Sequence, residues 1–383
     1  MRRACGLLVL LWSLTWVPLG TLAAPLEVGG KSSFLIDVAT GTVLHEANAH
    51  EPLAPASVTK VMTMLLIMEA IDSGTIHWDD TVTTSEAAAA KGGSQVYLKV
   101  GETMTVTDML KSIAVSSAND CACAMAEHIA GSEAAFVERM NQRAKELGMN
   151  DTHFVNCTGL DDSEDAKSHR TSAHDIAIMS RQLLKYHPEI KKFTTIWMDS
   201  VRNGAFGLSN TNKLVRFYDG ATGLKTGFTS GAGYCLSASA MRDGMELIAV
   251  VMGAENSKER FNACKAMLDH GFASYALFQP DLTETGAVPV KLGKAALVSP
   301  ILGEQASLLV EKARKGSITA DVQLEEALTA PVTQGQRLGT LTVKDGEQVL
   351  KEIPLVAGES VERLTYGDLF GVVLRRAAMA RTA

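Results

Sequence analysis

Three short strings, widely separated along the chain, bring together residue types that can attack a carbonyl group. The strings are Ser57-Val58-Thr59-Lys60, Ser117-Ala118-Asn119 and Lys225-Thr226-Gly227. Between them they supply a hydroxyl nucleophile, an amine base, a second hydroxyl, a carboxamide and a cation. Any one string is common by chance, but the three together, in this order, indicate active-site serine chemistry on a peptide or β-lactam carbonyl.

The first string pairs a nucleophile with a base. Ser57 opens a helix predicted to run from Ser57 to Asp72, and Lys60 follows three residues later on the same face. A serine hydroxyl attacks well only when a neighbouring base takes its proton. Lysine can be that base only if its pKa is lowered by burial or by a nearby cation, which Lys225 could supply. The alternative is a helix-capping Ser57 with a solvated Lys60, but apolar residues on almost every face of this helix favour burial.

The second string lies in a break between two predicted helices, residues 108–115 and 120–129. In such a loop the hydroxyl of Ser117 can pass a proton to a leaving amine, and the carboxamide of Asn119 can hold a substrate carbonyl. Serine and asparagine are also favoured helix caps, which is the alternative interpretation of both residues.

The third string begins a predicted strand. Lys225 and Thr226 can bind a carboxylate, and Gly227 allows a substrate backbone to approach the strand edge closely. The alternative is an edge-strand lysine that discourages aggregation. All three alternatives would have to hold independently for the chain to lack this chemistry.

The elements that must position these residues predict an α+β fold. Residues 32–47 are typical of a β-hairpin, and residues 233–252 are typical of a second hairpin around Arg242-Asp243-Gly244. Helices are predicted between the two hairpins and again at residues 259–275. Strands early and late in the sequence, with helices between them, favour an antiparallel sheet covered by helices.

The chain divides into four predicted segments. Residues 1–24 carry Arg2 and Arg3 before a short apolar run, which is typical of a secretory signal peptide rather than an uncleaved membrane anchor. Residues 25–278 would form the main domain, and short strands separated by turn residues predict a small all-β domain at residues 281–362. Residues 363–383 fit an amphipathic helix with flanking arginines. That helix could lie in a membrane interface or pack on its own domain. We therefore expect an exported protein, located outside the cytoplasmic membrane in the periplasm or cell wall.

Composition argues against several classes of function. The chain has 383 residues, 46% hydrophobic and 21% charged, and its net charge of −7 gives no sign of a nucleic-acid partner. Beyond the signal segment the cysteines are odd in number and form no tight framework, which argues against a disulfide scaffold. The nearest match to a zinc-binding H-E-x-x-H string runs from His45 to His50, but it is one residue too long and follows a strand. We expect neither a metal site nor a cofactor.

On these residues the chain resembles the serine D-alanyl-D-alanine carboxypeptidases, which are the low-molecular-mass penicillin-binding proteins. The resemblance implies a penicillin-binding or β-lactamase-like transpeptidase domain, and it extends from about residue 30 to the C-terminus. The strings that support it besides the three are Ala54-Pro55-Ala56, Gly92-Gly93-Ser94-Gln95, His153-Phe154-Val155-Asn156 and Gly223-Leu224. The chain departs from the family pattern at Ala118, where glycine is common and an added methyl could either be tolerated or narrow the cleft. It departs again at Cys157, where proline is frequent.

The resemblance implies catalytic roles for the first two strings. Ser57 would attack the carbonyl between two D-alanines and become acylated, while Lys60 would accept its proton. Ser117 and Asn119 would handle proton transfer and substrate positioning. The backbone N–H groups of Ser57 and Phe228 would form the oxyanion hole.

The resemblance implies substrate binding by the third string and by one later residue. Lys225 and Thr226 would engage polar groups of the substrate, alongside Gly227. Arg260 would meet the terminal carboxylate. The implied partners are the peptidoglycan stem peptide and β-lactam antibiotics as inhibitors, with peripheral membrane contact through the C-terminal helix.

Two other functions compete with a D,D-carboxypeptidase. Class A β-lactamases use a loop glutamate for deacylation, whereas the loop from Thr158 to Thr171 has Glu164 but no Glu-x-x-Leu-Asn string. The extra β domain also exceeds what a β-lactamase needs. The third possibility is a non-catalytic wall-binding module on the same fold. An intact set of polar groups argues against it, since buried polar groups without a partner are costly.

Overall fold

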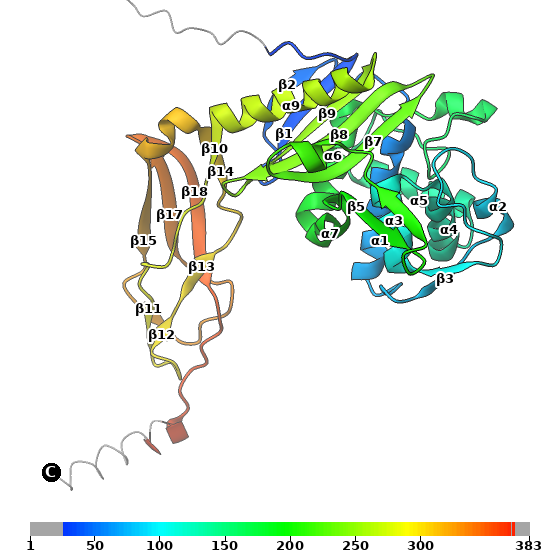
Figure 1. Cartoon of the computed structure of the whole chain (residues 1–383). Helices are drawn as coiled ribbons and strands as arrows, with labels where there is room; N and C mark the ends of the chain where they lie inside the picture. The colour runs from blue at the N-terminus through cyan, green and yellow to red at the C-terminus, as the bar shows by residue number, and fades with distance from the viewer. Residues whose placement is uncertain (1–25, 369, 372–383) are drawn as a thin grey trace, which may run out of the picture.

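The computed structural model describes residues 26–368 together with residues 370 and 371 (Figure 1). The predicted signal segment, residues 1–24, and most of the predicted C-terminal helix, residues 363–383, lie outside the described residues. Residues 26–274 contain both helices and strands and are called the N-terminal portion here. Residues 275–368 form an elongated, β-rich C-terminal portion. The predicted α+β fold with a β-rich C-terminal part is confirmed.

A five-stranded antiparallel sheet forms the centre of the N-terminal portion. Its strands are β1 (Ser32–Asp37), β2 (Val43–Ala47), β7 (Ala221–Thr229), β8 (Gly233–Arg242) and β9 (Met245–Ala254), in the order β2-β1-β9-β8-β7. The two predicted hairpins are present, as β1 with β2 and as β8 with β9. Because β7 pairs with β8 alone, the string Lys225-Thr226-Gly227 lies on an edge strand of this sheet.

Helices cover both faces of the sheet (Figure 1). One face packs against α9, whose apolar residues form a core with β8 and β9. The other face packs against a larger helical layer. The longer helices are α1 (Lys60–Asp72), α3 (Val106–Ser116), α4 (Asn119–Ala130), α5 (Glu133–Glu146), α6 (Ala173–Tyr186) and α9 (Ser257–Ser274).

The central helix α1 is buried on nearly all sides, as its apolar sequence predicts. Its start differs from the prediction of one helix over residues 57–72. A 3-10 helix, η1 (Ala56–Thr59), precedes α1, so the first string is wound more tightly than an α-helix. Pro55 stands at the N-terminal end of η1, where its ring leaves no backbone N–H to satisfy.

Shorter elements connect these helices and strands. They include two two-stranded sheets, β3 with β4 and β5 with β6. Their bounds are β3 (Thr81–Thr83), α2 (Glu86–Ala89), β4 (Thr103–Thr105), η2 (Glu164–Ser168), η3 (Pro188–Ile190), α7 (Lys191–Thr194), β5 (Met198–Val201), β6 (Phe206–Ser209) and α8 (Leu214–Phe217).

The C-terminal portion has its own hydrophobic cores, separate from those of the N-terminal portion. Its elements are β10 (Tyr275–Phe278), β11 (Val288–Lys291), β12 (Leu297–Val298), β13 (Pro300–Leu302), β14 (Leu308–Glu311), η4 (Lys312–Ser317), β15 (Ile318–Leu324), β16 (Leu328–Thr329), β17 (Arg337–Asp345) and β18 (Gln348–Ala357). They form three sheets: β10-β14, β12-β11-β16 and β13-β18-β17-β15. The strand β10 follows α9 directly and pairs with β14, so the chain joins the β-rich portion as soon as the helix ends.

Truncating Phe34 to alanine should strongly destabilise the N-terminal portion. Its ring is fully buried and meets the ring of His174 on α6 edge to face, at 5.5 Å between centroids. Loss of a buried phenylalanine ring costs about 3–5 kcal/mol, whereas Phe217→Ala, at a ring that is 73% exposed, should cost less than about 1 kcal/mol. Urea unfolding followed by the fluorescence of Trp78 and Trp197 measures this, since no other tryptophan follows the signal segment. Equal unfolding free energies for the two variants would contradict the assigned core.

Candidate active site

The first string brings its amine and its hydroxyl into contact. The tight turn of η1 places Lys60 Nζ 3.0 Å from Ser57 Oγ. The same amine donates to the backbone oxygen of Thr158 at 2.8 Å. Lys60 has no exposed surface, so the solvated-lysine alternative is wrong. Once the amine is neutral, the short contact lets its lone pair accept the serine proton.

Burial makes Lys60 a base near neutral pH. It lowers the pKa of Lys60 to about 7, although the nearby Cys157 and Asp120 act in the opposite direction. Of the two causes expected, burial or a nearby cation such as Lys225, burial is the one that lowers this pKa. The pKa of Lys225 itself lies well below its ordinary value, because of burial and then the positive charges of Lys60 and Arg260.

The loop after His153, a residue in an isolated β-bridge, supplies the second hydrogen-bond acceptor of Lys60. The side chain of Asn156 accepts hydrogen bonds from the backbone N–H groups of Thr158, at 3.1 Å, and Gly159, at 2.6 Å. Thr63 on α1 donates to the backbone oxygen of Cys157 at 2.7 Å. These bonds hold the Thr158 carbonyl against the amine. Sequence reasoning missed Thr158. The available signal was that a buried lysine needs a second acceptor.

The second string turns the chain sharply between α3 and α4. Ser117 adopts a left-handed conformation, with φ 62° and ψ 30°, directly after α3. Asn119 begins α4, and its side-chain nitrogen donates to the backbone oxygen of Gly92 at 2.7 Å. Within the part of the chain that the structure describes, Ser117 Oγ and Asn119 Oδ1 are buried and have no hydrogen-bond partner. Such atoms are rare in folded proteins and are consistent with groups that a ligand satisfies.

The departure at Ala118 adds a methyl group to the hydrophobic core. Its side chain is fully buried and belongs to the hydrophobic core of the helical layer. Its φ of −58° is ordinary for any residue, so glycine is not needed there. Of the two outcomes expected, this placement favours tolerance of the added methyl over narrowing of the cleft.

The third string lies directly against the first. A Cβ atom at Gly227 would lie 2.7 Å from the backbone oxygen of Pro55 and 3.1 Å from the backbone nitrogen of Ser57. Only glycine permits this approach of β7 to η1. The edge strand and the nucleophile are therefore neighbours.

Thr211 connects the third string to the second, and sequence reasoning missed it. Thr226 Oγ1 donates to Thr211 Oγ1 at 2.6 Å. The backbone N–H of Thr211 donates to the oxygen of Val115, near the end of α3, at 3.2 Å. The sequence around Thr211 has no motif that would have identified it, because its role arises from where its loop folds back.

The remaining predicted substrate-binding residues surround the end of β7. Lys225 is buried and donates from Nζ to the backbone oxygen of Thr226 at 2.8 Å. Phe228 is 53% exposed, and its ring packs on Tyr234 at 4.3 Å between centroids. Arg260, from α9, donates from Nη1 to the backbone oxygen of Gly227 at 2.8 Å. Arg260 is thus at the third string but largely buried, and its contact with a substrate carboxylate stays a prediction.

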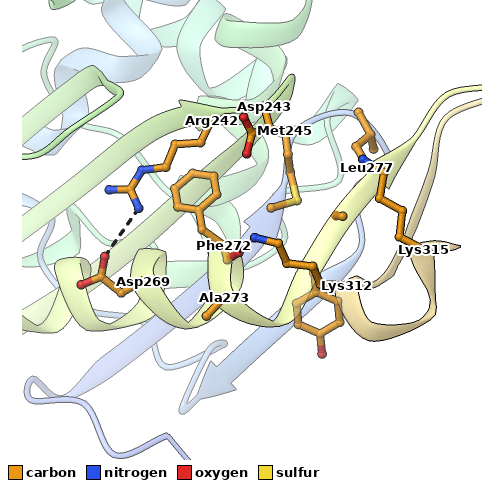
Figure 2. A pocket seen from close by; sticks show the side chains of 11 residues that line it. Arg242, Asp243, Met245, Asp269, Phe272, Ala273, Leu277, Lys312 and Lys315 are labelled. Carbon is orange, nitrogen blue, oxygen red and sulfur yellow. Dashed lines mark hydrogen bonds and ion pairs between the residues drawn. The ribbon is translucent and has the colours of Figure 1, made fainter.

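A hollow elsewhere on the surface takes no part in this arrangement (Figure 2). It has a volume of about 290 Å³ and lies where α9, β10 and η4 meet. Arg242, Asp269, Phe272 and Lys312 are among its lining residues, and none of the three strings contributes.

Three potential metal ligands also lie together, away from the three strings: His50, Asp151 and His174. His50 Nδ1 is 2.8 Å from Asp151 Oδ2, and His174 Nδ1 is 2.9 Å from the carboxylate of Asp175. The two imidazoles therefore already have hydrogen-bond partners. The first bond joins the segment after β2 to the loop after α5, and the second lies within the first turn of α6, which supports a structural role for both histidines.

Comparison with known proteins agrees with this geometry. The family profile of D-alanyl-D-alanine carboxypeptidases matches residues 20–256, and that of the penicillin-binding protein 5 C-terminal domain matches residues 272–363. The D-alanyl-D-alanine carboxypeptidase DacF of Bacillus subtilis is 45% identical over 351 residues, which cover 90% of this chain and 89% of that protein. The crystal structure of penicillin-binding protein 5 from Haemophilus influenzae aligns with a TM-score of 0.70 at 30% identity, covering 88% of this chain and 99% of that one.

A further solved structure aligns with part of the chain. Penicillin-binding protein D2 of Listeria monocytogenes, in its ampicillin-bound form, aligns with a TM-score of 0.59 at 32% identity. The alignment covers 64% of this chain and 99% of that one. With the profile match, the relatives and the convergence of the three strings taken together, the chain belongs to the D-alanyl-D-alanine carboxypeptidase family.

Proposed function

We propose that this protein is a serine D,D-carboxypeptidase that removes the terminal D-alanine from peptidoglycan stem peptides through an acyl-enzyme at Ser57. The observation that carries the proposal is the contact of a fully buried Lys60 amine with Ser57 Oγ at 3.0 Å. Family membership supports the substrate class, and the distances within the site support the task proposed for each residue.

In the acylation step, Ser57 Oγ attacks the carbonyl carbon between the two D-alanines while Lys60 takes its proton. The negative charge on the carbonyl oxygen would be stabilised by the backbone N–H groups of Ser57 and Phe228. The C–N bond then breaks, and the departing D-alanine amine receives a proton through the hydroxyl of Ser117. Water hydrolyses the resulting ester, which frees the shortened peptide and restores Ser57.

The groups around this reaction would orient the peptide. The unpartnered oxygen of Asn119 can accept a substrate N–H, and Thr226 with Lys225 can meet polar groups of the terminal residue. The exposed ring of Phe228 offers an apolar surface at the end of the strand. The open side of β7 permits an extended peptide to run alongside it.

A β-lactam would be attacked by the same serine, and we propose that its ester is long-lived. The Listeria relative was solved with ampicillin bound. In this chain Glu164, the loop carboxylate closest to a β-lactamase pattern, is 90% exposed and pairs with Lys167 at 2.8 Å. It therefore points into solvent and is not placed to act as the deacylating base that a class A β-lactamase needs.

We further propose that the protein acts outside the cytoplasmic membrane, where peptidoglycan is its substrate. Among the described residues, none of the helices combines the length and the apolar character needed to cross a bilayer. Membrane contact through residues 363–383 stays a prediction, because most of that segment lies outside the described residues.

Replacing Ser57 by alanine should abolish both penicillin labelling and D-alanine release. Intact-mass spectrometry after incubation with benzylpenicillin should show one adduct per chain on the unchanged protein and none on Ser57→Ala. Release of D-alanine from a peptide ending in D-Ala-D-Ala should fall by more than about 10³-fold. Ser73→Ala, at an exposed serine just after α1, is the matched control and should keep the adduct. An unchanged protein without an adduct would refute the proposal, and rapid turnover of penicillin would favour a β-lactamase.

The acylation rate should rise with pH through about 7, because Lys60 acts as a base only in its neutral form and its pKa is lowered to about 7. Below that pH the rate constant should change about tenfold per unit, and above it the rate should level off. Stopped-flow measurement of acylation from about pH 5 to about pH 9 tests this, with a β-lactam whose carboxylate is ionised throughout. A flat profile, or a rise only near the ordinary pKa of lysine, would contradict a neutral Lys60.

A further inference from the structure

Three consecutive hydrogen bonds run behind the nucleophile and end on the peptide that carries it. The backbone N–H of Val155 donates to His169 Nδ1 at 3.1 Å. His169 Nε2 lies 2.8 Å from Thr59 Oγ1, and Thr59 Oγ1 donates to the backbone oxygen of Ala56 at 2.8 Å. Thr59 has no exposed surface and His169 is 3% exposed. None of these side chains belongs to the catalytic set described above.

The direction of each bond in this chain is fixed by chemistry. A backbone N–H can only donate, so Nδ1 of His169 must be its unprotonated nitrogen and Nε2 must carry the proton. Nε2 therefore donates to Thr59, whose single hydroxyl proton is left for the Ala56 oxygen. Burial, reinforced by positive charges nearby, lowers the pKa of His169 to about 4, so the ring stays neutral at neutral pH.

The last bond controls where the N–H of Ser57 points. The oxygen of Ala56 and the N–H of Ser57 belong to one planar peptide, in which they point in opposite directions. Holding the oxygen on Thr59 therefore turns the N–H away from the protein interior behind η1. The Ser57 nitrogen lies beside Gly227 of β7, where a Cβ atom would come within 3.1 Å of it. The proposed substrate would also lie along β7.

The conformation of the Ala56–Ser57 peptide is strained and must be stabilised by surrounding residues. Ala56 has φ +47°, a left-handed conformation that is unfavourable by roughly 1–2 kcal/mol for a residue with a Cβ. Gly159 packs so closely that a Cβ there would lie 1.8 Å from the Ala56 oxygen. The carbonyl is thus confined by a glycine on one side and bonded by Thr59 on another.

We propose that Thr59 and His169 are positioning residues for acyl transfer, whose hydrogen bonds hold the Ala56–Ser57 peptide so that the Ser57 N–H points at the developing oxyanion. The inference rests on the proposed function, since it assumes that Ser57 forms the acyl-enzyme. Neither side chain touches the substrate. Their effect should fall on the acylation rate constant. A misdirected oxyanion donor stabilises the transition state less well but changes the stability of the initial complex little.

Acylation kinetics with benzylpenicillin test the proposal, with the non-covalent binding constant and the acylation rate constant resolved by stopped flow. Thr59→Val keeps the side-chain shape but removes the hydroxyl. It should lower the acylation rate constant by about 10-fold to 100-fold and change the binding constant less than about 3-fold. Thr59→Ser restores the hydroxyl and should recover most of the rate. Thr194→Val removes an equally buried hydroxyl bond, 2.6 Å to the oxygen of Thr222, and is the matched control with an unchanged acylation rate.

His169 provides a second arm with its own readouts. His169→Leu should slow acylation as Thr59→Val does, and His169→Gln, which keeps an N–H donor, should be faster than His169→Leu. Nitrogen NMR of the histidine-labelled protein should show His169 neutral and protonated on Nε2. These measurements on His169 test the proposal even if Thr59→Val does not fold.

The outcomes separate this inference from the function on which it rests. If the unchanged protein forms no adduct, the proposed function fails. If the unchanged protein is acylated and Thr59→Val is acylated at the same rate, the proposed function stands and the inference is overturned. Equal slowing by Thr59→Val and Thr59→Ser would also overturn it, since packing rather than the hydroxyl would then be responsible.

Discussion

The buried amine of Lys60 is the constraint on which the rest of the site depends. An amine without access to water must find acceptors inside the protein, because an unpaired buried polar group costs several kcal/mol, roughly 2–7 by transfer measurements. Two oxygen atoms meet this need here, Ser57 Oγ and the carbonyl oxygen of Thr158. One of them is the nucleophile. The contact that satisfies the buried amine is therefore also the contact that joins base and nucleophile, and the burial that requires it lowers the pKa of the amine.

The surrounding elements can be understood as supports for this arrangement. The helical layer buries α1, and the loop after Asn156 turns a carbonyl inward to meet the amine. The sheet places β7 at its edge, where one side pairs with β8 and Gly227 packs against η1. An edge strand beside a nucleophile is a suitable surface for an extended peptide, since the strand offers backbone hydrogen bonds and the nucleophile lies next to the bound carbonyl. The same geometry explains why glycine is required at residue 227.

Much of this could be predicted from the sequence, because the relevant signals are local. Apolar stretches separated by turn residues indicated the two hairpins. The apolar composition of residues 61–71 indicated a buried central helix that carries Lys60. The bonds that position these groups could not be predicted in the same way. Thr158 acts through a backbone oxygen, which every residue possesses, and Thr211 acts because its loop returns to the end of α3. Two causes for the lowered pKa of Lys60 also stayed open at the level of sequence, burial and the charge of Lys225, because a sequence shows which charges exist but not how deeply each is buried.

The central claim is that Lys60 is a neutral amine in a substantial fraction of molecules at neutral pH. The most direct measurement is an NMR titration of the lysine side-chain carbon and nitrogen signals in the unliganded protein, with the Lys60 signal assigned by its absence from Lys60→Arg. If Lys60 is the base, this amine should titrate with a pKa of about 7. A Lys60 that remains protonated until the pH approaches the ordinary lysine value would contradict the account, because the amine in contact with Ser57 would then be unable to accept its proton.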